Sequence, residues 1–438
     1  MLKKAALCFG LISLTTAGLA QGPVPTGVPL LDHVFVIMME NHGYEQVVNN
    51  PDEPYLNELL WYKQVNAATN YFAVGHPSLT NYLEIVGGSN FGVRSDNAPN
   101  WGSTSCSPNI VTGIVNADDG GGTKAPGVPA KLDTGTICPI AGSGMDAATP
   151  AVDTWNEVGG PFLSLADIDG VKAVPAAKTV GMTIGDQLAA SGLQWKSYQE
   201  SLPVGPIAGV NYSNGTATNL TNFAYLTPLT SSSVVQDYAV KHNPFAYFQS
   251  VQDGTNPENS LANVVAFDGP GGLYADLASG NVPAFSFVVP NQCNDQHGRG
   301  NADAFCAFDP GANNSGYTYG TQVGLNRGLI QQGDTTIKRL VTAIHASPVW
   351  QLGRTAIVIV WDENDYSGST KVLSGLFPPQ NQNRVVLTVQ TNFMGKTGIQ
   401  SANYYNSYSL LKSIEAGFGL PCLNHACDAN VAVMSDLF

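Results

Sequence analysis

The sequence feature that most constrains this chain is an apolar run that ends abruptly on polar side chains. Residues 35–39 are five consecutive apolar residues, and Glu40, Asn41 and His42 follow directly. A short continuous apolar run of this kind predicts a strand inside a sheet that is covered on both faces. In open α/β sheets, ligands bind beyond the carboxyl ends of such strands. Glu40 and Asn41 are therefore candidate site residues.

A second apolar run of the same design lies far downstream. Residues 356–361 form it, and Asp362 and Glu363 follow. Alone, each of these acids is a typical solvated strand end, but two buried strands ending at one sheet edge would bring them together. Oxygen ligands suit Ca²⁺, Mg²⁺ or Mn²⁺, and less typically Zn²⁺ or Fe. The pattern predicts one divalent metal ion, of unspecified identity, with the ligands Glu40, Asn41, Asp362 and Glu363.

Composition limits the classes of partner. The chain has 438 residues, of which 43% are hydrophobic, and its formal net charge is −14 at pH 7. It is long enough to bury a large core. An acidic surface argues against a nucleic-acid partner, which would require clustered basic residues.

The first 20 residues have the pattern of a signal peptide. Lys3 and Lys4 precede a mostly apolar stretch, and small residues follow up to Ala20. The alternative is a buried first helix. No later apolar stretch approaches the roughly 18 residues that a transmembrane helix needs. We therefore expect a secreted or periplasmic protein with no transmembrane segment.

Cysteine usage agrees with export. Six cysteines follow the predicted leader, and an even number in an exported chain indicates disulfides. Many pairings are compatible with the sequence. Proximity favours Cys106–Cys138, Cys293–Cys306 and Cys422–Cys427. A zinc–thiolate site is a poor alternative, because the sequence has no Cys-x-x-Cys pair.

Hydrophobic periodicity predicts strands that alternate with helices. The expected strands are residues 33–39, 283–289, 355–361 and 384–390, and the expected helices are residues 54–63, 183–191, 274–279, 334–345 and 407–418. This alternation predicts an α/β layered fold around a mostly parallel sheet. We expect one elaborated domain over residues 21–438. Its loop-rich insertions, or a cap over the site, would occupy about residues 87–160 and 201–235.

Ser78 lies in what should be a turn from a strand into a helix. Gly75 and Pro77 precede it, and an apolar stripe at helical spacing follows. A Ser at a helix N-terminus is often only a cap, but an anion is also stabilised there. A Ser hydroxyl becomes a good nucleophile only when a base or a metal lowers its pKa. The divalent ion predicted above would do so, which makes Ser78 a candidate nucleophile and further metal ligand.

Three basic residues are candidates for proton transfer or phosphate contact. His297 follows another predicted buried strand and could protonate a leaving oxygen. Its alternative is a surface histidine fixed by the Cys293–Cys306 loop. Lys241 and His242 are rare positive candidates in an acidic chain, and both could contact phosphate.

Six motifs occur in an order that resembles a known family. They are ENHGY, GHPSLTNYLEIVGG, YAVKHNPF, VVPNQCNDQHG, VIVWDEND and YSLLKSIE, which together extend over roughly residues 32–420. This order resembles the secreted phosphoesterase family of bacterial acid phosphatases and phospholipases C, within the alkaline-phosphatase-like superfamily. The phosphatase-like branch, with its KHNPF block, fits better than the phospholipase branch.

The resemblance implies a fold and a chemistry. The fold would be a three-layer α/β sandwich with a mixed, mostly parallel central sheet flanked by helices. The activity would be hydrolysis of small phosphate esters through a phosphoserine at Ser78. Asn81 occupies the place where related phosphodiesterases bind a phosphate oxygen, so it joins the candidate catalytic residues. His297, Lys241 and His242 would assist.

Two departures from the family pattern keep alternatives open. Asn406 and Ser407 stand where members often carry Asp-His, and the acidic-glycine run after Trp-Asp-Glu is replaced by residues 364–367. The leading hypothesis is a metal-dependent phosphomonoesterase of the acid phosphatase type. The alternatives are a phospholipase C-type phosphodiesterase and a non-catalytic, phosphate-binding member.

Overall fold

A computed structural model describes most of the chain after the predicted leader. The described residues are 21–75, 78–91, 93, 96, 99, 180–202, 237–298, 306, 326–364, 383–393, 395 and 397–438. The predicted signal peptide, nearly all of the two predicted insertions and the predicted Cys106–Cys138 bridge lie outside them. The other two predicted disulfides, Cys293–Cys306 and Cys422–Cys427, are confirmed.

Within this described part, eight strands form one mixed sheet in the order β5-β4-β6-β1-β7-β8-β2-β9. The strands are β1 (His33–Met39), β2 (Asn66–Ala68), β4 (Trp195–Gln199), β5 (Val264–Ala266), β6 (Phe285–Val289), β7 (Thr355–Trp361), β8 (Leu387–Thr391) and β9 (Gln400–Ser401). The five strands from β5 to β7 are mutually parallel, whereas β8 is antiparallel to both of its neighbours. A separate parallel pair consists of β3 (Tyr71–Phe72) and β10 (Tyr405–Asn406).

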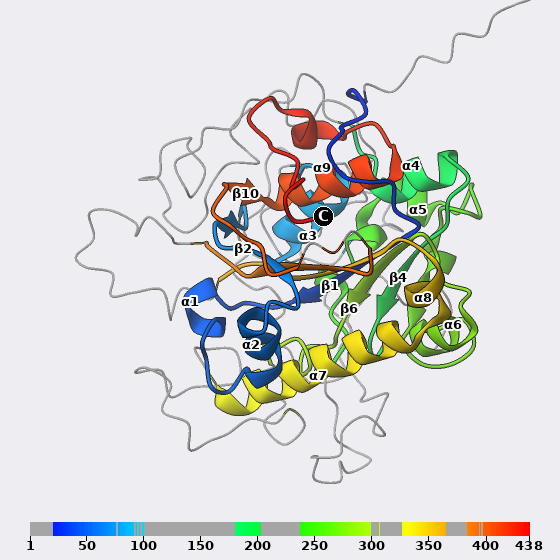
Figure 1. Ribbon diagram of the computed structural model, residues 1–438. Coiled ribbons are helices and arrows are strands. Elements are labelled where there is room, and N and C mark those ends of the chain that lie inside the picture. The colour runs from blue at the N-terminus through cyan, green and yellow to red at the C-terminus, as the bar shows by residue number, and fades with distance from the viewer. Residues whose placement is uncertain are drawn as a thin grey trace, which may run out of the picture.

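Helices cover both faces of the sheet (Figure 1). They are α1 (Tyr44–Val47), α2 (Pro54–Trp61), α3 (Ser78–Gly87), α4 (Ile184–Ala190), α5 (Gln249–Gln252), α6 (Leu273–Ser279), α7 (Arg327–Ala346), α8 (Pro348–Leu352) and α9 (Ser407–Phe418), with 3-10 turns η5 (Val240–His242), η6 (Pro244–Tyr247), η7 (Leu261–Asn263) and η8 (Asn424–Cys427). Helices α3 and α9 pack together on one face. On the other face, α7 contacts α2, α6 and α8. These three layers confirm the predicted α/β fold class.

The central strands are buried as their composition predicts. Strand β1 is buried from Val34 onward and β7 along its whole length, because helices cover both faces. The largest differences from the predicted boundaries are at the starts of two elements. Helix α7 begins at Arg327 rather than at residue 334, since the Asn326 side chain caps it by accepting hydrogen bonds from two backbone N–H groups. Strand β8 begins at Leu387 rather than at residue 384.

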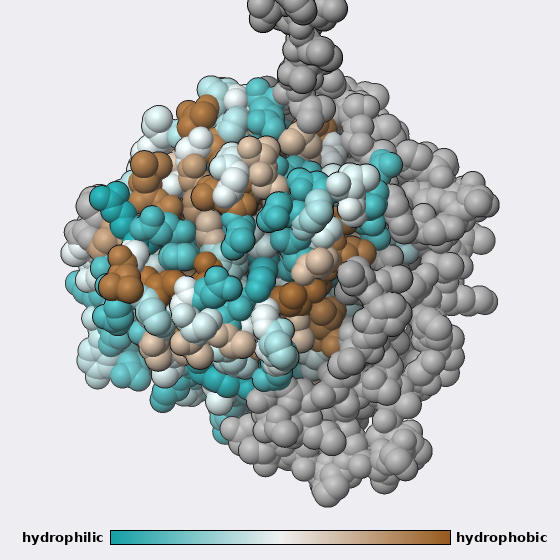
Figure 2. All heavy atoms as spheres, turned by 90° about the vertical axis from the view of Figure 1, so that its right-hand side faces the viewer, coloured by the Kyte–Doolittle hydropathy of each residue, from teal (hydrophilic) through white to brown (hydrophobic). Residues whose placement is uncertain are grey.

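Figure 2 shows the face of the molecule that lies over α4, α5, α6 and α8, where hydrophobic residues occur in small groups between polar ones. Across the described residues, the exposed large hydrophobic side chains include Trp61, Tyr62 and Leu352. None of the helices in this part of the chain is both long enough and apolar enough to span a bilayer.

Candidate active site

The predicted convergence of the two strand ends is present. Strands β1 and β7 are parallel neighbours with Met39 beside Trp361, so Glu40 and Asp362 leave the sheet side by side. The Asn41 backbone N–H donates to Asp362 Oδ1 at 2.9 Å, and its side-chain amide donates to Glu363 Oε1 at 3.2 Å. Asn41 has a φ of 60°, a left-handed conformation that Asn tolerates better than most residues.

Ser78 lies between these carboxylates as the first residue of α3. Its hydroxyl is 3.1 Å from Glu40 Oε2 and 3.2 Å from Glu363 Oε1. Hydrogen bonding from Ser78 also lowers the pKa of Asp362. A serine carries a single O–H hydrogen, so it cannot donate to all of these carboxylates at once. The arrangement therefore leaves buried negative charge that a proton or a cation must offset.

Asn81, one turn further along α3, holds the segment that leads into Ser78. Its Oδ1 accepts hydrogen bonds from the backbone N–H groups of Val74 and Gly75 at 3.1 and 3.0 Å. Its Nδ2 donates to the Gly75 carbonyl at 2.8 Å and to Glu363 Oε2 at 3.2 Å. In this structure Asn81 holds the backbone of Val74 and Gly75 and the Glu363 carboxylate, and its contact with phosphate stays a prediction.

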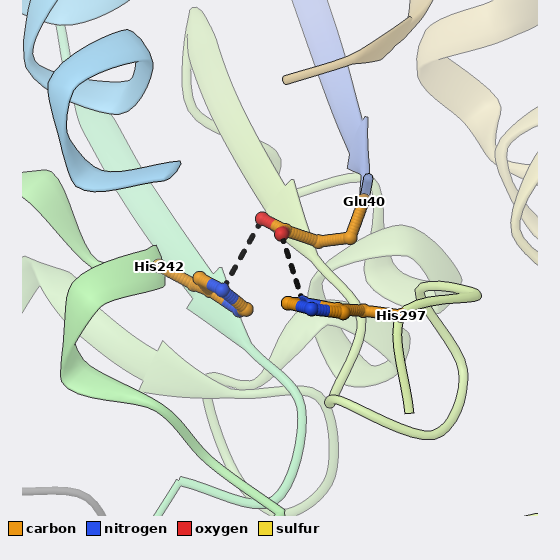
Figure 3. A group of neighbouring side chains, drawn as sticks. All are labelled: Glu40, His242 and His297. Atoms are coloured by element: carbon orange, nitrogen blue, oxygen red, sulfur yellow. Dashed lines mark ion pairs between the residues drawn. The ribbon is translucent and has the colours of Figure 1, made fainter. Parts of the chain in front are cut away.

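Two histidines bracket Glu40 (Figure 3). His242 Nε2 lies 3.2 Å from Glu40 Oε1, and His297 Nδ1 lies 3.3 Å from Glu40 Oε2. All three side chains are buried, and their ligand atoms lie within 4.8 Å of one another. Tyr82 of α3 donates a 2.5 Å hydrogen bond to Glu40 Oε1, and its ring stacks on that of His242. Glu40 is therefore shared between the Ser78 side and the histidine side of the site.

The loop after β6 supplies His297 and a further carboxylate, Asp295. Asp295 Oδ2 lies 3.6 Å from His242 Nδ1, and the Asp295 backbone carbonyl accepts a 2.9 Å hydrogen bond from the Glu40 N–H. The other carboxylate oxygen of Asp295 accepts from the His297 N–H at 2.8 Å. Three parallel strand ends, β1, β6 and β7, thus meet in one cluster.

Lys241 approaches the cluster through Asp96. Its Nζ lies 2.9 Å from Asp96 Oδ2, and Asp96 Oδ1 accepts the Leu79 backbone N–H at 2.9 Å. Both side chains are buried. The Lys241 charge lowers the pKa of Glu40 and of Glu363. The paired Asp96 carboxylate acts in the opposite direction on Glu363 and raises its pKa, so Lys241 and Asp96 place both charges next to the first turn of α3.

The carboxylates of the cluster have pKa values that are shifted in opposite directions: that of Glu40 is lowered, and those of the others are raised. Burial by itself would raise the pKa of Glu40, but His242 and His297 outweigh it and hold that pKa well below its usual range. Burial raises the pKa of Asp362 and of Glu363 well above the usual range, and the charge on Glu40 raises both further. Burial and the Glu40 charge likewise raise the pKa of Asp295. These groups repel one another unless a cation joins them.

The donor set fits divalent metal. The predicted donors are the oxygens of Glu40, Asn41, Asp362, Glu363 and Ser78, and their sharing of one ion stays a prediction. The only atom of Asn41 in this set is its side-chain carbonyl oxygen, because an amide N–H is a hydrogen-bond donor and here donates to Asp362 and Glu363. A second group consists of Glu40, His242 and His297, next to Asp295. Imidazole ligands extend the choice of metal beyond Ca²⁺ and Mg²⁺ toward Mn²⁺, Fe and Zn²⁺.

Asn406 and Ser407, the departure from the family pattern, have local structural roles here. The Asn406 side chain accepts the Ser409 backbone N–H at 3.0 Å and caps α9. Ser407 is buried, and its hydrogen bond lowers the otherwise raised pKa of Tyr71.

Sequence reasoning missed three members of the cluster: Asp295, Tyr82 and Asp96. Asp295 had a usable signal, because it follows buried strand β6 just as Glu40 follows β1. Tyr82 was assigned to the apolar stripe of α3, and its hydroxyl contact with Glu40 depends on tertiary packing. Nothing in the sequence around Asp96 distinguished it as a site residue.

Comparison with known proteins gives the family of the chain. The family model described as the Phosphoesterase family matches residues 49–305 and 327–421, well over half of the chain. The chain belongs to the Phosphoesterase family. Proteins similar to it include an acid phosphatase from Aspergillus fumigatus and a probable acid phosphatase from Kluyveromyces lactis, each 22% identical over 91% of this chain.

The chain spans only 57% and 61% of the lengths of these two relatives. Among solved structures it is similar to a protein of the alkaline phosphatase superfamily from Vibrio parahaemolyticus. That likeness has a TM-score of 0.41 and 13% sequence identity, and it covers 91% of this chain and 69% of the other.

Proposed function

We propose that this member of the Phosphoesterase family is an exported, metal-dependent phosphomonoesterase of the acid phosphatase type, with Ser78 as nucleophile. The observation that carries the proposal is the position of the Ser78 hydroxyl. It lies at the N-terminus of α3, between Glu40 and Glu363. Similarity to proteins named acid phosphatases supports the choice of phosphate esters as substrates, and the disulfides support export.

The chain's own residues supply most of the reaction. Ser78 Oγ attacks phosphorus in line with the leaving oxygen, and its proton passes to a neighbouring carboxylate. Glu40 Oε2 and Glu363 Oε1, at 3.1 and 3.2 Å from the hydroxyl, are the carboxylate oxygens within reach of that proton. His297 donates a proton to the leaving oxygen as the bond between that oxygen and phosphorus breaks. Water then attacks the phosphoserine and gives a proton to His297, the Ser78 O–P bond breaks, and the neighbouring carboxylate returns its proton to Ser78.

A divalent cation bound to the carboxylates would lower the pKa of Ser78 and offset charge on the phosphoryl oxygens. Glu40, Asn41, Asp362 and Glu363 would hold it, with Ser78 completing the shell. The backbone N–H groups at the start of α3 and the charge of Lys241 would further stabilise the phosphoryl group.

Release of p-nitrophenol from p-nitrophenyl phosphate and from bis(p-nitrophenyl) phosphate, with and without chelator, tests the proposal. We expect chelator-sensitive hydrolysis of the monoester. Preference for the diester would favour the phospholipase C-type alternative, and no turnover of either would favour a non-catalytic member. Ser78→Ala should abolish turnover with the fold intact, and a variant that kept more than about a tenth of kcat would contradict covalent catalysis by Ser78.

A further inference from the structure

The loop after β6 alternates between two surroundings. Asp295 and His297 face the active-site cluster. Asn294 and Gln296 instead face α7. Asn294 Oδ1 accepts a 2.8 Å hydrogen bond from Gln332 of that helix, and Gln296 Nε2 lies 3.3 Å from the Ile330 carbonyl. What holds Gln296 therefore also sets the direction of its two neighbours.

Gln296 is held at both ends of its amide. Its Oε1 accepts a 2.9 Å hydrogen bond from Trp361 Nε1, and Trp361 directly precedes Asp362. Its Nε2 donates to Glu53 Oε2 at 2.5 Å. The Gln296 backbone carbonyl lies 3.3 Å from His42 Nε2. The side chain is 1% exposed, so these contacts are shielded from water.

The backbone of Gln296 adopts a conformation that only this environment explains. Its φ is 85°, in the left-handed region that is costly for a residue with a side chain. Such a conformation persists where surrounding contacts determine it. Here those contacts come from β7 through Trp361, from the start of α2 through Glu53, and from α7.

Gly333 of α7 makes the space for Gln296. A Cβ added to Gly333 would lie 2.1 Å from Gln296 Cγ and 2.9 Å from its Cδ, which are impossible separations. Gly333 lies inside a long helix, where glycine is less favourable than alanine. Its φ is not positive, so the helix backbone does not require it. The missing side chain is explained by the Gln296 side chain that occupies its place.

We propose that Gln296, seated in the space left by Gly333, is a positioning residue that fixes Asp295 and His297 against Glu40. The inference rests on the proposed function of this cluster in phosphoester hydrolysis. Gln296 touches no substrate, and it acts by holding the strand ends of β6 and β7 in one arrangement.

The test compares Gly333→Ala, Gln296→Ala and their double variant with a matched control. The control is Gln331→Ala, an exposed residue of α7 that bonds to Asp52 and lies outside the site. We expect Gly333→Ala to lower kcat and to weaken Mn²⁺ binding in a calorimetric titration, each by roughly 10–100-fold, the range for loss of a residue that supports metal ligands. The ligands concerned are Asp362, which follows Trp361, and Glu40, against which His297 is held. The pH profile should shift with it, and the control should match wild type.

Non-additivity distinguishes positioning from general damage. With the Gln296 side chain removed, the added methyl of Gly333→Ala has room, so the double variant should resemble Gln296→Ala alone. Should Gly333→Ala fail to fold, Gln296→Met is the second variant. It keeps the size of the side chain and removes the hydrogen bonds that the Gln296 amide makes with Trp361 and Glu53. It should show the same losses in Mn²⁺ binding and the same shift in pH profile.

The two proposals fail in different ways. Suppose that wild type hydrolyses phosphate esters, and that Gly333→Ala and Gln296→Met both match it in Mn²⁺ affinity and in the pH profile of activity. Only the positioning inference is then overturned. If wild type binds Mn²⁺ but hydrolyses no phosphate ester, the proposed function fails, and weaker Mn²⁺ binding in the variants still supports the positioning of this cluster. A wild-type chain that shows neither property overturns both.

Discussion

Tyr82→Phe removes one hydroxyl from the most charged part of the site. That hydroxyl donates a 2.5 Å hydrogen bond to buried Glu40, and the ring would stay stacked on His242. A hydrogen bond to a charged group contributes about 1.5–3 kcal/mol to stability. With an unfolding entropy of about 2.1 cal/mol/K per residue, a loss near 2 kcal/mol lowers Tm by roughly 2–3 °C in a chain of this size.

The pH dependence of this loss identifies Glu40. Its pKa in the folded protein is held below the unfolded value, so the stability from ionised Glu40 is present above its ordinary pKa and is lost as pH falls through the lowered value. Removing a donor raises the folded pKa. The stability difference between wild type and Tyr82→Phe should therefore be largest near neutral pH and should narrow on acidification. The acidic limb of kcat/KM should move to higher pH.

Tyr198→Phe is the matched control. Tyr198 donates a 2.7 Å hydrogen bond to buried Asp276, so the same type of bond is lost at a carboxylate outside the cluster. Chemical denaturation of chelator-treated proteins over a pH series measures the stability, and p-nitrophenyl phosphate turnover with added metal measures the activity. The control should lose similar stability with an unchanged activity profile. If the stability difference between wild type and Tyr82→Phe grew on acidification, the Tyr82 hydroxyl would not be stabilising ionised Glu40.

Two further predictions concern the metal and the loop after β6. Metal analysis of protein purified without chelator should find about one divalent ion per chain, lost in Asp362→Ala, and full activity of metal-free wild type would contradict this. Replacing Cys293 and Cys306 together by Ser should cost about 3 kcal/mol for a separation of 13 residues and should weaken Mn²⁺ binding. Replacing Cys422 and Cys427 should cost about 2 kcal/mol, for a separation of 5, with Mn²⁺ binding unchanged.

The sequence was sufficient to predict the central strands and the residues at their ends. Strands β1 and β7 are continuous apolar runs, and such runs have few alternatives to a buried strand. Strand β4 was missed because its sequence, WKSYQ, carries polar residues. Its buried polar groups bond to each other, as Gln199 Nε2 does to Ser197 Oγ at 2.9 Å, and periodicity does not report such pairing.

The composition of the site was predicted more fully than its connections. Glu40, Ser78, His242 and His297 were each singled out, but the bracketing of Glu40 by both imidazoles was not. That contact requires η5 to pack on α3, which brings together segments far apart in the chain. The left-handed backbone of Gln296 likewise depends on tertiary contacts and leaves no local mark in the sequence.

The most direct test of the central claim is to acid-quench the enzyme during turnover of p-nitrophenyl phosphate and locate phosphate by peptide mass spectrometry. We expect one phosphoryl group on Ser78, formed only with divalent metal present and absent from Ser78→Ala. Turnover by wild type at full rate with no phosphoryl group on Ser78, or with the group on another residue, would contradict it.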